Sequence, residues 1–432
     1  MITPGLTRRS ALAAAAGLGV SVSFLGRTAY AAADGDLARR KLIILVCRGG
    51  MDGLSVSPPV GDANYAALRG RIAIAPFGAP DGALKLDDTF GLHPALKATY
   101  RLHQAGQARI APAVATPDRA RSHFEAQDVL ESGGTVAYGA GSGWLNRTLQ
   151  ALAPARRIEA LSVGTQAPLI LRGKIQAASW SPGGLEGRDT RLPAILADLY
   201  AHDALLGPAL ASGLETQSMA KAASALASAQ AAEMAPAGGD TVMTSAQTAA
   251  QAPSGQGQGG GAQAARSVGV TVAKFMTEPN GPQIVAISVD NFDTHANQGA
   301  GQGLLATRLG YLDGLIDGLS SGLGAEWANT VIVAATEFGR TAHVNGTGGT
   351  DHGTASTALV LGGGLKQAGI VGDWPTLQQA RLFENRDTAP TLDMRALFKG
   401  VLSEHLGVDR RALDTAIFPD STAVAATRGV VN

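Results

Sequence analysis

Short runs of apolar residues alternate along the chain with longer segments in which apolar residues recur every three or four positions. The first run, LIILV at 42–46, is apolar throughout and ends in the glycine-rich stretch RGGMDG. A run of this kind is typical of a strand buried on both faces of a parallel sheet. Similar runs follow at ARIAPAVAT, IEALSVG, QIVAISVD, TVIVAATE and STALVLGGG.

The intervening segments have helical periodicity. They include HFEAQDVLESG from 123, LPAILADLYAHDALL at 192–206, GLLATRLGYLDGLIDGLSSGL at 303–323 and TLDMRALFKGVLSEHLG at 391–407. In the third of these, leucine or isoleucine at 305, 309, 312, 315, 316 and 319 lies along one helical face. Strands that alternate with helices predict an α/β fold, a doubly wound, mostly parallel sheet with helices on both faces.

One region differs in composition from the rest. Residues 212–265 are dominated by alanine, glutamine, glycine and serine. Their first part, QSMAKAASALASAQAAEM at 217–234, can form an alanine-rich helix, and the remainder to about 263 has the composition of a flexible linker or surface insertion. Strands on both sides are needed for one sheet, so we expect a single domain over 34–432 that contains this insertion.

The N-terminus has the layout of a twin-arginine export signal. Arg8 and Arg9 precede a mild apolar run at 11–24, and small-x-small cleavage sites follow before residue 34. The alternative, a membrane anchor, is disfavoured because a span needs about 20 apolar residues. We therefore predict a cleaved signal peptide at 1–33, a periplasmic or otherwise extracytoplasmic mature protein, and no membrane span in the mature chain.

Charge and cysteine content exclude some classes of protein. Lys+Arg and Asp+Glu both number 35, so the chain has no electrostatic reason to bind nucleic acid. The single cysteine, Cys47, excludes an intrachain disulfide. Because Cys47 lies in an apolar run, it is interpreted as a small buried hydrophobe rather than a nucleophile.

Polar residues follow four of the predicted strands, at the edge where ligands bind in open α/β sheets. They are Asp52; Ser122 and His123; Asp290, Asp293 and His295; and Glu337 and Arg340. His352 precedes its strand and joins the same edge if that strand runs antiparallel. Singly, each residue has a structural explanation, such as a turn, a helix cap or a local ion pair. Their convergence on one edge favours a site.

Five motifs resemble one known family. GGMDG, RSHFEAQD, DNFDTHANQ, TEFGRT and GGTDHG, within about 41–407, are similar to the exported family known as domain of unknown function 1501. The order of elements is more distantly similar to the alkaline phosphatase, sulfatase and phosphomutase superfamily. That resemblance implies an alkaline-phosphatase-like fold, a divalent ion (Zn²⁺, Mn²⁺ or Mg²⁺), and hydrolysis or transfer at a phosphate or sulfate ester of a small-molecule or polymeric substrate.

The resemblance also implies roles for residues of one metal site. Ser122 matches the nucleophile and Asp52 matches the first acidic ligand beside it. Glu337 and Phe338 stand where the superfamily has consecutive Asp and His. A phenylalanine cannot ligate a metal, so this site lacks a ligand unless His123 or His343 substitutes for it.

The resemblance implies a second metal site with a complete set of ligands. They are Asp290 or Asp293, with His295 and His352. We therefore expect one metal site rather than two, with Arg340 or Arg121 available to bind the substrate anion. The alternative is a catalytically degenerate binding or assembly protein of the cell envelope, which Phe338 favours.

Overall fold

The computed structural model describes residues 37, 39–152, 160–163, 168–175, 177–180, 258–279 and 281–431. The predicted signal peptide at 1–33 and the helices predicted at 192–206 and 217–234 lie outside these residues.

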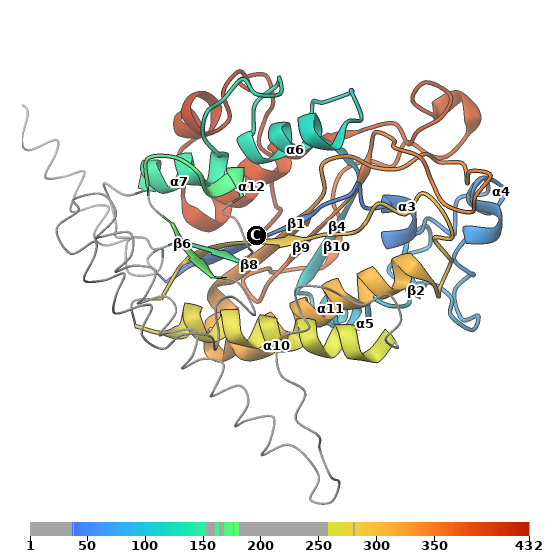
Figure 1. Cartoon of the computed structure of the whole chain (residues 1–432), viewed down its shortest axis with the longest axis horizontal. Coiled ribbons are helices and arrows are strands. Elements are labelled where there is room, and N and C mark those ends of the chain that lie inside the picture. The colour runs from blue at the N-terminus through green and yellow to red at the C-terminus, as the bar shows by residue number, and fades with distance from the viewer. Residues whose placement is uncertain are drawn as a thin grey trace, which may run out of the picture.

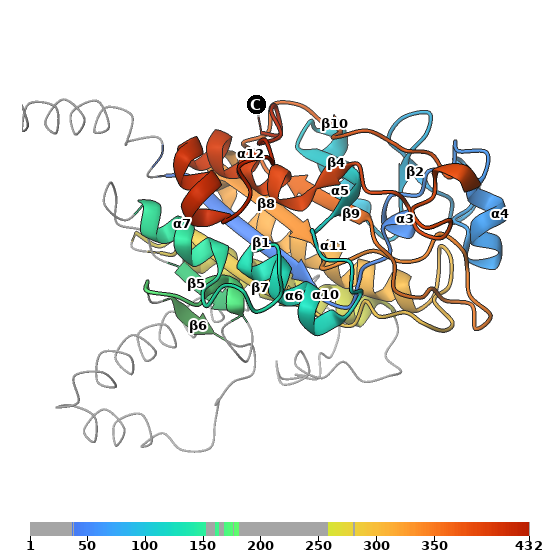
Figure 2. The ribbon, with the colours of Figure 1, turned by 90° about the horizontal axis from the view of Figure 1, so that it is seen from above.

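A nine-stranded sheet forms the centre of the molecule. In spatial order its strands are β10 (Gly369–Ile370), β4 (Ala108–Ala115), β9 (Ser356–Leu361), β8 (Thr330–Ala335), β1 (Lys41–Cys47), β7 (Ile284–Val289), β5 (Ala160–Val163) and β6 (Ala178–Trp180), and β11 (Leu392–Asp393) pairs with β4. Figure 2 shows the central strands side by side. All described pairs in this sheet are parallel except those of β9, which runs antiparallel to β4 and β8. The predicted mostly parallel sheet is confirmed.

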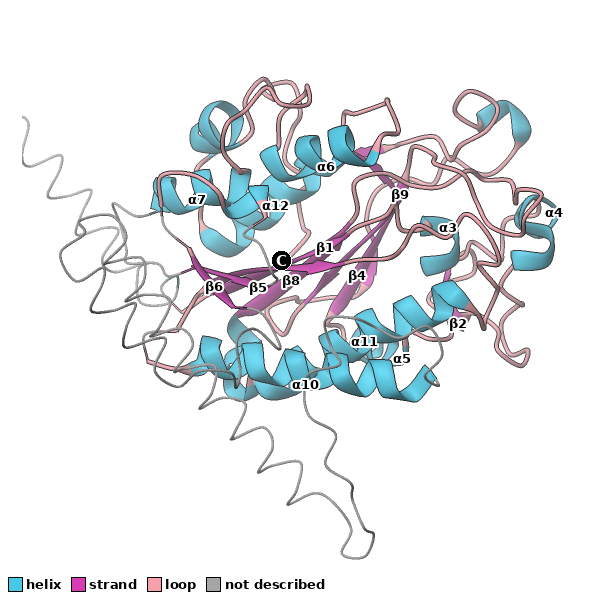
Figure 3. Ribbon diagram, viewed as in Figure 1, coloured by secondary structure: helices cyan, strands magenta, loops and turns pink. Residues whose placement is uncertain are grey.

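Helices cover both faces of the sheet (Figures 1 and 3). One face carries α6 (His123–Ser132), α7 (Trp144–Leu152) and α12 (Met394–Leu406), and the other carries α5 (Lys97–Gln104), α10 (Gln258–Thr277) and α11 (Leu304–Gly322). Alternate residues of β1 enter the two hydrophobic cores: Leu42, Ile44 and Val46 face one, and Ile43, Leu45 and Cys47 face the other. This double burial explains why the strand is apolar throughout.

Shorter elements lie mainly in the connections. They are α3 (Gly53–Val56), α4 (Tyr65–Arg69), η2 (Gly70–Ile72), η3 (Leu169–Leu171), η5 (Gly324–Asn329), η6 (Gln379–Arg381), η7 (Ala412–Ile417) and the antiparallel pair β2 (Leu84–Lys85) and β3 (Gly91–Leu92). Among the described residues, no helix combines the length and the apolar character needed to cross a membrane.

The end of the low-complexity region is helical. Residues to about 263 were expected to form a linker or surface insertion, but α10 begins at Gln258 and packs along α11. Glycines on α11 permit this close approach: a Cβ on Gly318 would lie 2.1 Å from the carbonyl oxygen of Arg266 on α10. Tertiary packing against a neighbouring helix therefore overrides the weak helix propensity of this segment.

We predict that Gly318→Ala lowers the free energy of unfolding by about 1–3 kcal/mol, because the added methyl group must push α10 and α11 apart. Gly310→Ala is the matched control on the same helix, since a Cβ there meets nothing within 4 Å. We expect this control to be neutral or to stabilise by up to about 1 kcal/mol through helix propensity. Urea unfolding of both variants measures the difference, and equal effects would contradict the packing explanation.

The carboxyl ends of β1, β4, β7 and β8 meet at one edge of the sheet. Because β9 is antiparallel, the residues before its first residue, Ser356, reach the same edge. This strand lies in the interior of the sheet, between β4 and β8, and not at its border. Loops from five strands thus surround one region.

Candidate metal centre

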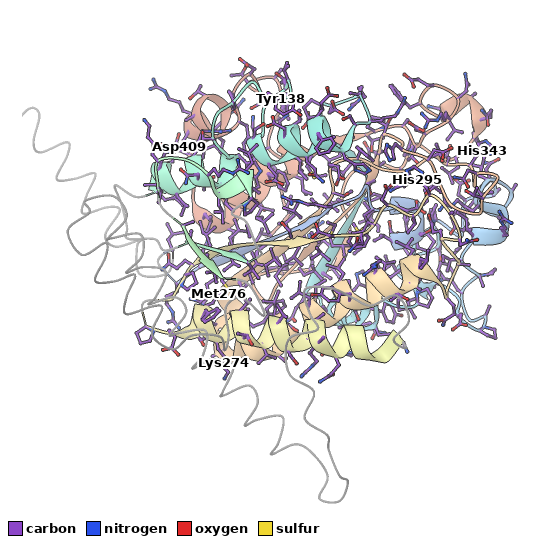
Figure 4. All side chains as sticks on the ribbon, in the orientation of Figure 1. Tyr138, Lys274, Met276, His295, His343 and Asp409 are labelled. Atoms are coloured by element: carbon purple, nitrogen blue, oxygen red, sulfur yellow. The ribbon has the colours of Figure 1, made fainter. Side chains whose placement is uncertain are left out.

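Three side chains from these loops offer possible metal ligands at one point. His123, Asp293 and His352 each present a ligand atom within 4.8 Å of the others. His123 is the first residue of α6, after β4; Asp293 follows β7; and His352 precedes β9. His295, two residues after Asp293, adjoins the group, and Figure 4 labels it.

The imidazole Nε2 atoms converge on the carboxylate of Asp293. His295 Nε2 lies 3.0 Å and His352 Nε2 3.4 Å from Asp293 Oδ1, and His123 Nε2 lies 3.5 Å from Oδ2. The Nε2 atoms of His295 and His352 are 3.0 Å apart. Ligand atoms around a tetrahedral zinc ion, each about 2.0–2.1 Å from the metal, are separated by roughly 3.3 Å. The observed spacing therefore fits the ligand shell of one ion.

Hydrogen bonds at the Nδ1 atoms of His123 and His352 fix the tautomer and the orientation of these two rings. His123 Nδ1 is 2.9 Å from Glu337 Oε1, and His352 Nδ1 is 2.8 Å from the carbonyl oxygen of Arg121. An ionised carboxylate and a carbonyl oxygen can only accept hydrogen bonds. We therefore assign the proton of each imidazole to Nδ1 and the free lone pair to Nε2. His123 Nε2 is also buried and has no hydrogen-bond partner in the described part of the chain. A buried polar atom without a partner is rare, and it is expected where the atom binds a metal ion.

Glu337 lies behind His123 and is fully buried. Its Oε1 accepts hydrogen bonds from the amides of Gly49 (2.8 Å) and Gly50 (3.0 Å) as well as from His123, and its Oε2 accepts from Thr336 Oγ1 (2.9 Å). Burial alone would raise the pKa of Glu337, but these hydrogen bonds lower it below its usual value. The hydrogen bond to this carboxylate raises the pKa of His123. Glu337 therefore orients His123 and holds a proton on its Nδ1.

Phe338 forms an apolar wall of the centre. Its ring centroid lies 4.8 Å from that of His123 and 4.8 Å from that of His352. The ring is in turn packed against Gly50, where a Cβ would approach it to 2.4 Å and where φ is +62°. Only glycine satisfies both demands without strain. Phe338 thus restricts the orientation of two imidazoles that point at Asp293.

Arg340 is buried and contacts oxygen atoms of three loops. Its guanidinium donates to Asp293 Oδ1 (2.5 Å) and to the carbonyl oxygens of Gly50 (2.6 Å), Thr350 (3.0 Å), Gly49 and Phe292. Burial would raise the pKa of Asp293, but the hydrogen bond and charge of Arg340 lower it below its ordinary value. Arg340 therefore keeps Asp293 ionised and commits its donors to the protein rather than to a substrate.

Asp52 lies in a separate buried network. Its carboxylate is hydrogen-bonded to Arg69, to Ser55 Oγ (2.8 Å) and to Gln298 Nε2 (2.7 Å). Gln298 Oε1 accepts from Thr294 Oγ1 at 2.8 Å, which links this network to the loop that carries Asp293. The structure therefore places Asp52 outside the group of candidate ligands.

The chain matches a family model described as "Protein of unknown function (DUF1501)" over residues 39–417. It belongs to this family. The resemblance predicted from the five motifs is confirmed. No protein of established annotation matches the sequence.

Several solved structures are similar to this DUF1501 protein. The C-terminal periplasmic domain of EcEptC from Escherichia coli in complex with Zn has 9% identity and a TM-score of 0.38, with 88% of this chain and 86% of that chain covered. Ps i-CgsB in complex with k-i-k-neocarrahexaose has 10% identity and a TM-score of 0.40, with 90% and 77% covered. A mutant of TAB5 alkaline phosphatase with Mg bound in its M3 site has 11% identity and a TM-score of 0.34, with 76% and 93% covered. Similarities this distant do not identify an activity or a substrate.

The other predicted site residues of this DUF1501 chain do not belong to the group of candidate ligands. Ser122 caps α6 by position, but its side chain makes no capping hydrogen bond. Asp290 is exposed and does not belong to the ligand group. His343 is exposed, whereas His123 belongs to the ligand group. Arg121 is paired with Glu384 (2.5 Å) and Asp387 (2.9 Å).

Proposed function

We propose that the protein is a metal-dependent hydrolase or transferase that acts on phosphate or sulfate esters outside the cytoplasm. One observation carries the proposal: imidazole Nε2 atoms from three loops converge on Asp293, and two of them are set in the ligand tautomer by hydrogen bonds at Nδ1. Such outer hydrogen bonds are typical of histidines that hold a metal ion.

The residues proposed to hold the ion are His123, Asp293, His295 and His352. Imidazole nitrogen together with a carboxylate oxygen suits Zn²⁺, Mn²⁺ or a similar ion. When bound, the ion supplies Lewis-acid polarisation of an ester oxygen. We propose one ion rather than two, because Glu337 is fully buried with both oxygens hydrogen-bonded to the protein, and Asp52 is buried in an ion pair with Arg69.

Ser122 is the proposed nucleophile. It precedes His123 directly, and its side chain is not engaged in capping α6. The first amides of an α-helix have no intrahelical acceptor, so the start of this ten-residue helix favours an anionic group nearby. In the proposed reaction Ser122 Oγ attacks the phosphorus or sulfur atom, the ester P–O or S–O bond breaks, and the alcohol leaves with the proton lost by the serine. Water or another acceptor then displaces Ser122 Oγ from the phosphoryl or sulfuryl group, and its proton returns to the serine. An extracytoplasmic location is proposed from Arg8, Arg9 and the apolar run that follows them.

Metal analysis and turnover test this proposal together. We expect the purified protein to bind about one Zn²⁺ or Mn²⁺ per chain and to hydrolyse aryl phosphate or aryl sulfate esters. Ser122→Ala should bind the ion with unchanged affinity and lose turnover, which separates the nucleophile from the ligands.

A protein that binds no divalent ion and stays inactive with added Zn²⁺, Mn²⁺ and Mg²⁺ would refute the hydrolase proposal. Metal binding without turnover of either ester would instead favour the second candidate, a binding or assembly protein. The observation that favours this candidate is Phe338, an apolar ring in contact with two of the imidazoles.

A further inference from the structure

A carboxylate from a distant loop lies behind two of the proposed ligands. Asp387 is fully buried; its Oδ2 accepts a hydrogen bond from Thr354 Oγ1 (2.9 Å) and forms an ion pair with Arg121 Nη2 (2.9 Å). Arg121 is two residues before His123, and Thr354 is two residues after His352. A single side chain thus joins the two chain segments that bring these histidines together.

The backbone of Arg121 needs such support. Its φ is +57°, in the left-handed region that a residue with a Cβ seldom adopts. In this conformation its carbonyl oxygen accepts the hydrogen bond from His352 Nδ1 at 2.8 Å. A strained conformation persists only where the surroundings hold it, and the guanidinium of Arg121 is held by Asp387 and Glu384.

The neighbour of Asp387 contacts the same histidine. Arg386 donates a hydrogen bond to the carbonyl oxygen of His352. The backbone of residue 387 also pairs with Thr341 in an isolated bridge, next to the loop that carries Arg340. The segment around Asp387 therefore contacts both the backbone of His352 and the residue that accepts its Nδ1 proton.

We propose that Asp387 is a positioning residue of the metal centre, which anchors Arg121 and Thr354 so that the Arg121 carbonyl keeps the proton of His352 on Nδ1 and leaves Nε2 for the ion. The inference rests on the proposed metal site, since it assigns His352 Nε2 as a ligand. Asp387 does not itself touch the ion or the substrate. Loss of its carboxylate acts on metal affinity through the tautomer and orientation of His352.

Asp313 provides a matched control. It too is a buried aspartate, with hydrogen bonds from the amides of Ala98 (2.7 Å) and Thr99 (2.8 Å). It lies on α11, on the helical layer that does not contain α6. Asp313→Asn therefore removes a buried carboxylate from the same fold without disturbing the candidate ligands.

The experiment measures Zn²⁺ affinity by chelator competition and the tautomer of His352 by long-range ¹H–¹⁵N NMR of the metal-free protein. For Asp387→Asn we expect Zn²⁺ affinity to fall by about 10–100-fold and the Nε2–H tautomer of His352 to become populated. For Asp313→Asn we expect lower stability with both readouts unchanged. If Asp387→Asn fails to fold, Arg121→Lys tests the same link and should change both readouts in the same direction.

The two proposals fail in different ways. Absence of Zn²⁺ binding by the wild-type protein would refute the metal site, while the tautomer of His352 would still report on Asp387. Wild-type affinity and a wild-type tautomer in Asp387→Asn, or in Arg121→Lys where the first variant does not fold, would overturn the positioning role. An equal loss of affinity in Asp313→Asn would also overturn it, because the effect would then follow from stability alone.

Discussion

Asp293→Asn should weaken the binding of Zn²⁺ by more than about 100-fold, beyond the effect typical of residues that only orient a ligand. The reason is that Asp293 is the residue on which the other candidate ligands converge, with nitrogen atoms 3.0 Å, 3.4 Å and 3.5 Å from its carboxylate oxygens. Asparagine is neutral and offers only one oxygen. Chelator competition on the purified variant measures the change.

Asp290→Asn is the control for this prediction. It changes the same residue type three positions earlier, in the same loop, but at an exposed side chain outside the ligand group. We expect it to bind Zn²⁺ as the wild-type protein does. If Asp290→Asn lost the ion and Asp293→Asn kept it, Asp290 and not Asp293 would be the ligand.

Arg340→Met should lower the free energy of unfolding by about 1–3 kcal/mol, the range expected when buried acceptors are left without their hydrogen-bond donor. The change leaves Asp293 without its cation and deprives the carbonyl oxygens of Gly50 and Thr350 of their donor. Because those groups belong to the loops after β1 and β7 and the loop before β9, we also expect the metal centre to be lost. Urea unfolding and Zn²⁺ titration measure the two effects.

Arg71→Met provides the comparison for Arg340. Arg71 is exposed and donates one hydrogen bond, at 3.1 Å, to the carbonyl oxygen of Gly346 in the same part of the chain. A surface change of this kind is expected to alter stability by no more than about 0.5 kcal/mol. Equal effects of the two substitutions would mean that Arg340 does not organise the loops.

The sequence predicted the fold class because local periodicity reflects burial. A strand covered by helices on both faces must be apolar at every position, as β1 is, and a helix covered on one side must be apolar along one face, as α11 is. The rule that ligands bind at the carboxyl ends of parallel strands then placed Asp293 and Glu337 at a common edge, and His352 joined them on the condition that its strand runs antiparallel.

Periodicity and strand position did not distinguish Asp290 from Asp293 as the ligand. Asn291, between them, has a φ of +74°, which redirects the chain so that Asp290 is exposed while Asp293 lies beside His295 and His352. Asparagine tolerates a positive φ more readily than most residues, but an asparagine in a sequence does not by itself predict this conformation. The conformation of a loop is decided by its contacts, which composition and periodicity do not contain.

Local periodicity and motifs were therefore sufficient to predict the alternation of strands and helices, the family, and the edge of the sheet where polar residues gather. The roles of those residues depend on contacts that form only in the folded chain. Glu337 and His123 are separated by 214 positions, and their hydrogen bond makes one a buried acceptor and the other a candidate ligand. Asp387 forms an ion pair with Arg121, and these two residues are also far apart in the sequence. Roles of this kind depend on long-range contacts, and these form only when the whole sheet brings its loops together.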